Sequence, residues 1–149
     1  MLQKDLSRPA AHILLVEDNP GDVRLMQEAL RNGSSSGRLT VVGSGDEALA
    51  FLFRRGEHGD AQRPDLIFLD LNLPGRDGRD VLSEIKKDKG LRRIPVVVLT
   101  TSESEEDVEN CYDLYANCYV KKPGDLDEFL TVVRQCEAFW LRIAKLPER

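Results

Sequence analysis

One stretch decides the fold of this chain: Pro64-Asp-Leu-Ile-Phe-Leu-Asp-Leu-Asn-Leu-Pro-Gly75. Its apolar part, residues 65–70, predicts a buried strand that ends in the carboxylate of Asp70. The Pro-Gly pair that closes the stretch predicts a turn, because these two residues favour the backbone angles of turns. The stretch therefore places one acidic group at the carboxyl end of a strand.

Three other apolar runs, over residues 11–17, 94–100 and 118–120, also end in polar groups. In an open parallel sheet, ligands bind in the crevice outside the carboxyl ends of the strands. We therefore expect these polar groups to converge with Asp70 at one edge of the sheet, where they would suit a divalent cation and a phosphoryl group. The expected members are Glu17, Asp18, Asp70, Thr100 and Lys122.

Segments of helical periodicity alternate with the apolar runs, which is the pattern of a parallel α/β sheet. A further short strand is expected over residues 39–42. The first expected helix follows Asn19-Pro20-Gly21, and the next four cover residues 46–53, 77–87, 105–115 and 125 onward. Ser104 is expected to cap the helix over residues 105–115.

The last expected helix carries two apolar stripes, although a surface helix normally needs one. The stripe that can face the sheet consists of Leu126, Phe129 or Leu130, Val133 and Trp140. The other stripe predicts either a dimer or partner interface or coverage by the tail of the chain itself. Its members are Val132, Cys136, Phe139 and Ile143.

Length and composition limit the possible classes of function. The chain has 149 residues and a formal net charge of −5, which suit one acidic domain over residues 11–149 behind a tail over residues 1–10. Nucleic-acid binding is not expected, because it requires a basic surface. No apolar run approaches the roughly 20 residues that span a bilayer, and the start lacks the apolar core of a signal peptide. The sequence thus predicts a cytoplasmic protein with no membrane partner.

The expected acidic cluster has a consequence for metal binding. Asp18 and Asp70 would repel each other in one crevice unless a cation or a proton lay between them. Magnesium takes oxygen ligands, usually one or two carboxylates, and fills its other positions with waters and phosphate oxygens. The backbone carbonyl of Asn72, two residues past Asp70, could supply another oxygen.

The same groups suit phosphoryl transfer. A carboxylate such as that of Asp70 can act as a nucleophile and form an aspartyl phosphate. The ammonium of Lys122 and the hydroxyl of Thr100 could then neutralise or bind the phosphoryl oxygens, with Mg²⁺ covering another. The sequence has no glycine-rich nucleotide loop of the P-loop type, so the phosphoryl donor must come from elsewhere.

The chain resembles the receiver domain of two-component response regulators from about Ala11 to Trp140. The resemblance rests on four motifs that occur in order at strand ends: Val-Glu-Asp-Asn, Leu-Asp-Leu-Asn-Leu-Pro-Gly followed by Asp-Gly, Val-Leu-Thr-Thr-Ser and Tyr-Val-Lys-Lys-Pro. It implies a flavodoxin-like, doubly wound α/β fold, with five helices around a five-stranded parallel sheet in the order 2-1-3-4-5.

The resemblance also implies a role for each site residue. Asp70 would be the phosphoacceptor, with Asp18, Asp70 and the Asn72 carbonyl on Mg²⁺ (Mn²⁺ or Ca²⁺ as possible substitutes) and Glu17 acting through water. Thr100 and Tyr119 would be the switch residues, and Lys122, joined to Pro123 by a cis bond, would contact the phosphate. Ser102 would lie where the family tunes dephosphorylation.

A narrower resemblance is to the single-domain regulators paired with bacterial phytochrome histidine kinases. It rests on Val-Glu-Asp-Asn-Pro-Gly-Asp, the long polar loop over residues 54–63, Asn-Cys-Tyr-Val and Phe139-Trp-Leu141. Such regulators tend to be homodimers that signal through the face built by the fourth helix, fifth strand and last helix. On that face the expected residues are Tyr112, Tyr115, Tyr119, Val132, Cys136, Phe139 and Ile143.

Other functions remain open from the sequence. The resemblance implies self-phosphorylation and slow autodephosphorylation at Asp70 but no free-standing enzyme, and a degenerate receiver could act as a scaffold alone. A Mg²⁺-dependent aspartyl-phosphate phosphatase would usually carry its nucleophile on the first strand. A flavin carrier would need phosphate-binding loops rich in glycine or hydroxyl groups, which an acidic crevice opposes.

Overall fold

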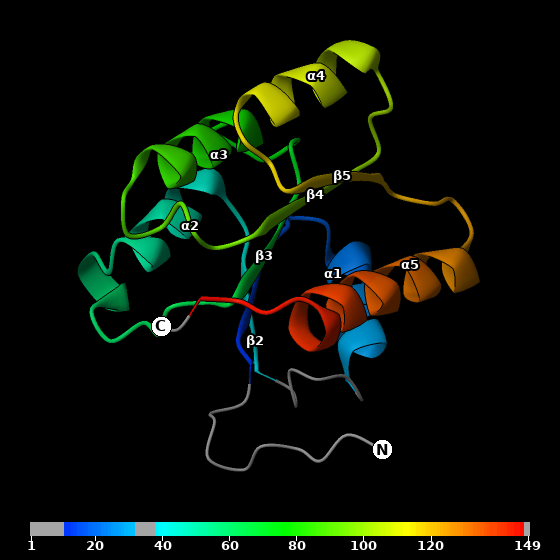
Figure 1. Ribbon diagram of the computed structural model, residues 1–149, viewed down its shortest axis with the longest axis horizontal. Coiled ribbons are helices and arrows are strands. Elements are labelled where there is room, and N and C mark those ends of the chain that lie inside the picture. Colours follow the sequence, from blue (N-terminus) through cyan, green and yellow to red (C-terminus); the bar gives the residue numbers. More distant parts are fainter. Residues whose placement is uncertain (1–10, 32–37, 148–149) are drawn as a thin grey trace.

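The computed structural model describes residues 11–31 and 38–147. Its strands form one parallel sheet in the order β2-β1-β3-β4-β5 (Figure 1), which confirms the expected topology. The strands are β1 (Ile13–Val16), β2 (Leu39–Val42), β3 (Leu66–Leu69), β4 (Val96–Thr100) and β5 (Cys118–Lys121).

Five α-helices cover the two faces of this sheet. Figure 1 shows α1 and α5 on one side and α2 and α3 on the other, with α4 beside β5. The helices are α1 (Pro20–Leu30), α2 (Gly45–Leu52), α3 (Gly78–Lys87), α4 (Glu105–Asp113) and α5 (Leu126–Ala138). Among the described residues, none of the helices has the length and apolar character needed to cross a membrane.

The central strands are apolar on both faces because helices cover both faces. Leu14 and Val16 of β1 join the core cluster on the α2 and α3 side, whereas Ile13 and Leu15 join the cluster on the α1 and α5 side. Burial on both sides holds the carboxyl end of this strand at a fixed depth in the sheet. Strand β3, which lies in the segment that predicted the fold, is buried in the same way, and each of its residues is fully buried.

Each α-helix begins at a side chain that accepts a hydrogen bond from a backbone N–H of its first turn. Such caps satisfy donors that the helix itself cannot satisfy. They fix where each helix leaves the carboxyl edge of the sheet. The capping residues are Asn19, Ser44, Asp77, Ser104 and Asp125, which confirms the expected cap at Ser104.

Some expected details were wrong. Helix α4 ends at Asp113 rather than near residue 115, because Tyr115 has a φ of 71° and so leaves the helical conformation. The polar loop after α2 contains a short 3₁₀ helix, Gly56–His58. The bond between Lys122 and Pro123 is not cis, since the described residues contain no cis peptide bond. The trans form is the more stable one for an X–Pro bond, by about 0.5–1 kcal/mol.

The two stripes of the last helix are also divided differently. Leu126 is 61% exposed, because it is the first residue of α5 and lies outside the contact with the core. Cys136, expected on the outer stripe, packs against the core cluster on the α1 side together with Trp140. The outer stripe therefore keeps Phe139 and Ile143 as its strongly exposed members.

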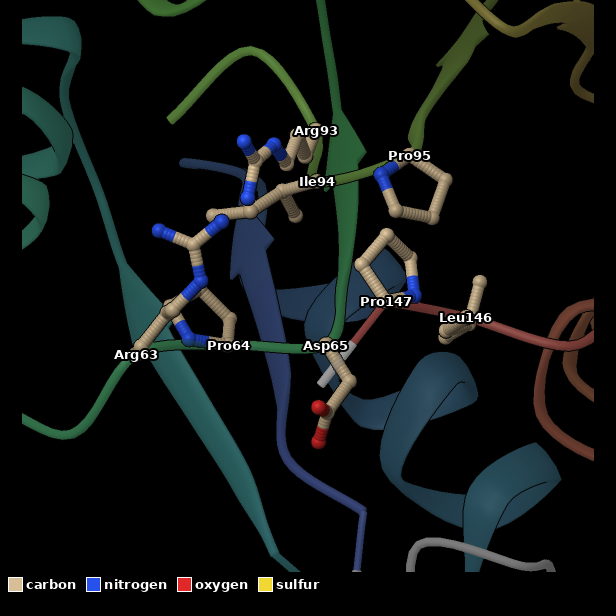
Figure 2. A pocket seen from close by; sticks show the side chains of 8 residues that line it. All are labelled: Arg63, Pro64, Asp65, Arg93, Ile94, Pro95, Leu146 and Pro147. Atoms are coloured by element: carbon tan, nitrogen blue, oxygen red, sulfur yellow. The ribbon is translucent and has the colours of Figure 1, made fainter. Parts of the chain in front are cut away.

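After α5 the chain continues as a short π-helix, Phe139–Ile143, and then crosses the amino end of the sheet. Figure 2 shows Leu146 and Pro147 beside the segments that lead into β3 and β4. The pocket between them has a volume of about 10 Å³, enough for about one water molecule. It lies at the end of the sheet opposite to the acidic residues. The expected tail over residues 1–10 lies outside the described residues.

The first residue of α3, Gly78, sits against the backbone that carries Asp70. A Cβ atom on Gly78 would lie 2.3 Å from the carbonyl oxygen of Asp70 and 2.6 Å from Cα of Leu71. Replacement by alanine must therefore displace backbone rather than a flexible side chain. Gly78→Ala is expected to lower the free energy of unfolding by about 1–3 kcal/mol, the usual cost of overpacking, as measured by urea unfolding.

Gly43→Ala is the matched control, because a Cβ atom there meets nothing within 4 Å. Its unfolding midpoint should stay close to that of the unsubstituted protein. Equal midpoints for the two variants would contradict the close approach of α3 to the Asp70 backbone.

Candidate functional site

An acidic cluster lies at the carboxyl edge of the sheet. Glu17 and Asp18 follow β1, Asp70 follows β3, and carboxylate oxygens of the three lie within 4.8 Å of one another. The parallel register, which pairs Val16 with Leu69, brings the two strand ends level. Glu17 and Asp70 are buried, whereas Asp18 is exposed. The predicted convergence of these acids is confirmed by the geometry.

The ammonium of Lys122 lies against this cluster. Its Nζ donates to a carboxylate oxygen of Glu17, to Oδ2 of Asp70 at 3.3 Å and to Oδ2 of Asp22 at 2.8 Å. Lys122 follows β5, so its buried side chain reaches past the end of β4 to residues that follow β1 and β3. The neighbouring Lys121 instead pairs at the surface with Glu103 at 2.8 Å.

Sequence reasoning missed Asp22 as a member of the site. Asp22 lies in the first turn of α1, and its backbone N–H donates to the capping side chain of Asn19. An acid in the first turn of a helix also has a common stabilising role, because it faces the positive end of the helix dipole. It lies four positions after Asp18 in the sequence, and this spacing was the only available signal.

Burial and charge shift the pKa values in this cluster. Burial raises the pKa of Glu17 to about 7, the negative charge of Asp70 adds to the rise, and the hydrogen bond from Lys122 opposes it. Burial alone would lower the pKa of Lys122, but hydrogen bonds to Asp22 and Glu17 outweigh burial and raise it above its ordinary value. A single ammonium thus faces several carboxylates, and the excess negative charge favours binding of another cation.

The hydroxyl of Thr100 lies at the end of β4, between the strands that carry Asp70 and Lys122. Its side chain is fully buried, and Oγ1 has no hydrogen-bond partner among the described residues. A buried polar group without a partner is rare and requires an explanation. A ligand oxygen in the crevice would supply the missing partner.

Asn72, two residues after Asp70, contacts Asp70 through its backbone amide. The backbone N–H of Asn72 donates to Oδ1 of Asp70 at 3.3 Å, so the two oxygens of Asp70 have different neighbours. The buried and exposed carboxylates offer the hard oxygen donors that divalent ions such as Mg²⁺ and Mn²⁺ accept. The donor set of Glu17, Asp18 and Asp70 therefore fits a divalent metal ion.

Tyr119 of β5 connects this edge to the surface. Its ring is partly buried against the core cluster on the α2 and α3 side, and Oη donates to the carbonyl of Ser102 at 2.8 Å. The backbone N–H of Tyr119 donates to Oη of Tyr112 at 3.2 Å. Tyr112 and Tyr115 are 48% and 76% exposed.

Comparisons with known proteins agree with this geometry. The profile of the response regulator receiver domain matches residues 13–134. The chain is 48% identical to the response regulator Rcp1 of Synechocystis sp. over 143 residues, which cover 96% of this chain and 97% of Rcp1. It is 40% identical to a probable methanogenesis regulatory protein, FilR2, of Methanothrix harundinacea over 87% of this chain and 83% of FilR2.

Solved structures extend the likeness to three dimensions. The structure of the phosphorylated cyanobacterial phytochrome response regulator RcpA is 51% identical in sequence and has a TM-score of 0.91, covering 94% of this chain and all of that one. The Mn²⁺-bound form of Rcp1 is 48% identical, with a TM-score of 0.89 and coverage of 93% and 99%. The acidic edge, the sheet order and these matches together show that this chain belongs to the family of response regulator receiver domains.

Proposed function

We propose that Asp70 accepts a phosphoryl group from the phosphohistidine of a histidine kinase, with Mg²⁺ bound by the acidic cluster. The observation that carries this proposal is the buried carboxylate of Asp70, which has a lysine ammonium at 3.3 Å and an unpartnered threonine hydroxyl at the end of the next strand. A phosphoryl group attached to Asp70 would have both a positive charge and a hydroxyl donor available to its oxygens.

The transfer needs few chemical parts. An oxygen of Asp70 forms the new P–O bond, the P–N bond to the kinase histidine breaks, and its electron pair returns to the imidazole. Lys122 already lies at hydrogen-bond distance from Asp70, and its ammonium can follow the developing charge on a phosphoryl oxygen. The hydroxyl of Thr100 donates to another oxygen. The metal ion, when bound, neutralises the remaining negative charge.

The acids divide the task of holding the metal. Asp18 and Asp70 are the proposed direct ligands, the Asn72 carbonyl a third, and Glu17 acts through water. Burial and the charge of Asp70 raise the pKa of Glu17 to about 7, so a cation bound nearby would also stabilise its ionised form. With a bound cation offsetting the charge of the acids, Lys122 would be free to turn from Glu17 and Asp22 toward the phosphoryl group.

The kinase that we propose as partner is a bacterial phytochrome. The support is the similarity to RcpA, described as a phytochrome response regulator, and to the bacteriophytochrome response regulator RtBRR, which is 38% identical with a TM-score of 0.73. Light would then control the phosphorylation of Asp70 in the cytoplasm.

Phosphorylation is tested by intact mass after incubation with acetyl phosphate and Mg²⁺. The protein should gain one phosphoryl group, and the gain should disappear when Mg²⁺ is removed by chelation. Asp70→Asn, which replaces one carboxylate oxygen by an amide nitrogen and removes the negative charge, should gain nothing. If neither protein gained mass, a scaffold function would be favoured over phosphoryl acceptance. A gain in Asp70→Asn would show that another residue accepts the phosphoryl group.

The metal site is tested with Mn²⁺, whose binding can be followed by electron paramagnetic resonance. Asp18→Asn should weaken binding by about tenfold or more, because it removes one charged ligand from the cluster. Asp60→Asn is the matched control, since Asp60 is exposed in the loop after the 3₁₀ helix at the other end of the sheet. Equal affinities for both variants would contradict Asp18 as a ligand.

We also propose that the chain forms a homodimer through α4, β5 and α5. The support is exposed apolar surface of a kind that isolated domains usually cover: Tyr112, Tyr115, Phe139 and Ile143 are all exposed by 46% or more. Val132 adds a partly buried apolar group on α5, while Tyr119 and Cys136 contribute mainly from beneath.

Sedimentation of a charged variant tests the dimer. Ile143→Glu should shift the protein to the monomer, because Ile143 is 75% exposed and a buried, unpaired carboxylate in an interface is costly. Leu126→Glu is the control, since Leu126 is an exposed leucine at the other end of α5. A monomeric unsubstituted protein, or a dimer in both variants, would exclude this interface.

A further inference from the structure

A network of side chains outside the phosphoryl site joins α3 to α4. Arg79, in the first turn of α3, donates through Nη2 to Oδ1 of Asp107 in the first turn of α4. Its other amino group donates to both oxygens of the capping residue Asp77, at 3.0 and 3.1 Å. The guanidinium is therefore held in one orientation by α3 and presents its free edge to α4.

Asp107 also contacts the loop between β4 and α4. Its second oxygen, Oδ2, accepts a hydrogen bond from the hydroxyl of Ser102 at 2.5 Å. Its backbone N–H donates to the hydroxyl of Ser104, the cap of α4. We call Arg79, Asp107 and Ser102 the α3–α4 clamp.

The clamp holds a peptide that receives Tyr119. Ser102 binds Asp107 through its hydroxyl, and its carbonyl accepts the hydrogen bond from the Tyr119 phenol at 2.8 Å. A shift of Ser102 away from Asp107 would carry that carbonyl away from Tyr119. The same peptide segment begins at Thr100, only two residues earlier, whose buried hydroxyl has no hydrogen-bond partner among the described residues.

Charge strengthens the clamp. Hydrogen bonds from Ser102 and Arg79 lower the pKa of Asp107, so the carboxylate stays ionised and both of its oxygens remain acceptors. Charge-assisted hydrogen bonds of this kind are shorter and stronger than neutral ones. Arg79 and Asp107 are 27% and 22% exposed as side chains, so solvent screens their attraction only in part.

We infer that Arg79 and Asp107 are positioning residues that hold the β4–α4 loop where Tyr119 docks on Ser102, and that they thereby favour the phosphorylated state. The inference rests on the proposed function, because it needs Thr100 to bind the phosphoryl group. A loop already fixed two residues from Thr100 loses less freedom when the hydroxyl binds, and such preorganisation favours the bound state. By linkage, Tyr119 docking and phosphoryl binding favour each other to the same extent, so a change that weakens docking also weakens phosphoryl binding, by at most the same factor.

The test uses the full chain labelled with 3-fluorotyrosine, whose ¹⁹F resonance for Tyr119 is assigned with Tyr119→Phe. Beryllofluoride with Mg²⁺ serves as the phosphoryl mimic, and its bound fluorines appear in the same spectrum. Asp107→Asn should lower the ratio of docked to undocked Tyr119 in the absence of the mimic by roughly two- to fivefold, the range for partly exposed ion pairs. The affinity for beryllofluoride should also fall, by at most the same factor.

Two further variants separate the clamp from general effects of charge. Glu103→Gln is the matched control, because Glu103 lies in the same loop but its carboxylate pairs with Lys121 at the surface rather than with the clamp residues. It should change neither the Tyr119 signal nor the affinity. Arg79→Gln should act like Asp107→Asn. The double variant should show a docked fraction of Tyr119 no lower than that of either single variant, since both substitutions remove the same interaction.

Ser102→Ala tests the clamp independently in case Asp107→Asn does not fold. It removes only the hydroxyl that binds Asp107 and leaves the carbonyl that binds Tyr119. It should also lower the docked fraction. An unchanged Tyr119 signal in Asp107→Asn and Ser102→Ala overturns the inference. So does a Tyr119 shift without any change in beryllofluoride affinity. If the unsubstituted protein binds no beryllofluoride and gains no mass with acetyl phosphate, the proposed function fails by itself, whatever the Tyr119 signal shows.

Discussion

The structure depends on the concentration of negative charge at the carboxyl edge of the sheet. Burying a carboxylate is costly unless a cation compensates for it, and here Glu17 and Asp70 are both buried. Among residues 11–31 and 38–147, Lys122 supplies the one ammonium in contact with them, and it also binds Asp22. Removing one partner from such a set leaves an uncompensated charge. The site therefore requires cations to compensate its negative charge, and the arrangement of these cations can change.

The sheet makes this concentration possible. Strands β1 and β3 are adjacent and in register at their last residues, while β4 and β5 place the hydroxyl and the ammonium one and two strands farther along. The helices on both faces keep water from the strands but leave their carboxyl ends open. Gly78 allows α3 to begin directly against the Asp70 backbone, which fixes the height of the acidic group. Chemistry and packing thus meet at the same peptide.

The edge also communicates with the outer surface through a short path. Thr100 ends β4 and Ser102 lies in the loop that follows it. Ser102 binds both Asp107 and Tyr119, and Tyr119 lies next to the exposed Tyr112. In a receiver domain a signal requires two populations whose balance the phosphoryl group shifts. The contacts described here hold one of these arrangements: Tyr119 against the core, with its phenol on the Ser102 carbonyl.

The sequence by itself determined the parallel α/β pattern and the main members of the site, because buried strands of this type have a strong apolar signal and each ends in its chemical group. It predicted that Glu17, Asp18 and Asp70 gather at one edge of the sheet, as they do, and it proposed Thr100 and Lys122 as further members of the site. Only the tertiary structure decided the side-chain partners across elements. Asp22 joins Lys122, Arg79 reaches Asp107, and Cys136 turns to the core. Those contacts join residues up to 100 positions apart, and their geometry follows from how helices pack on the sheet, which no local pattern encodes.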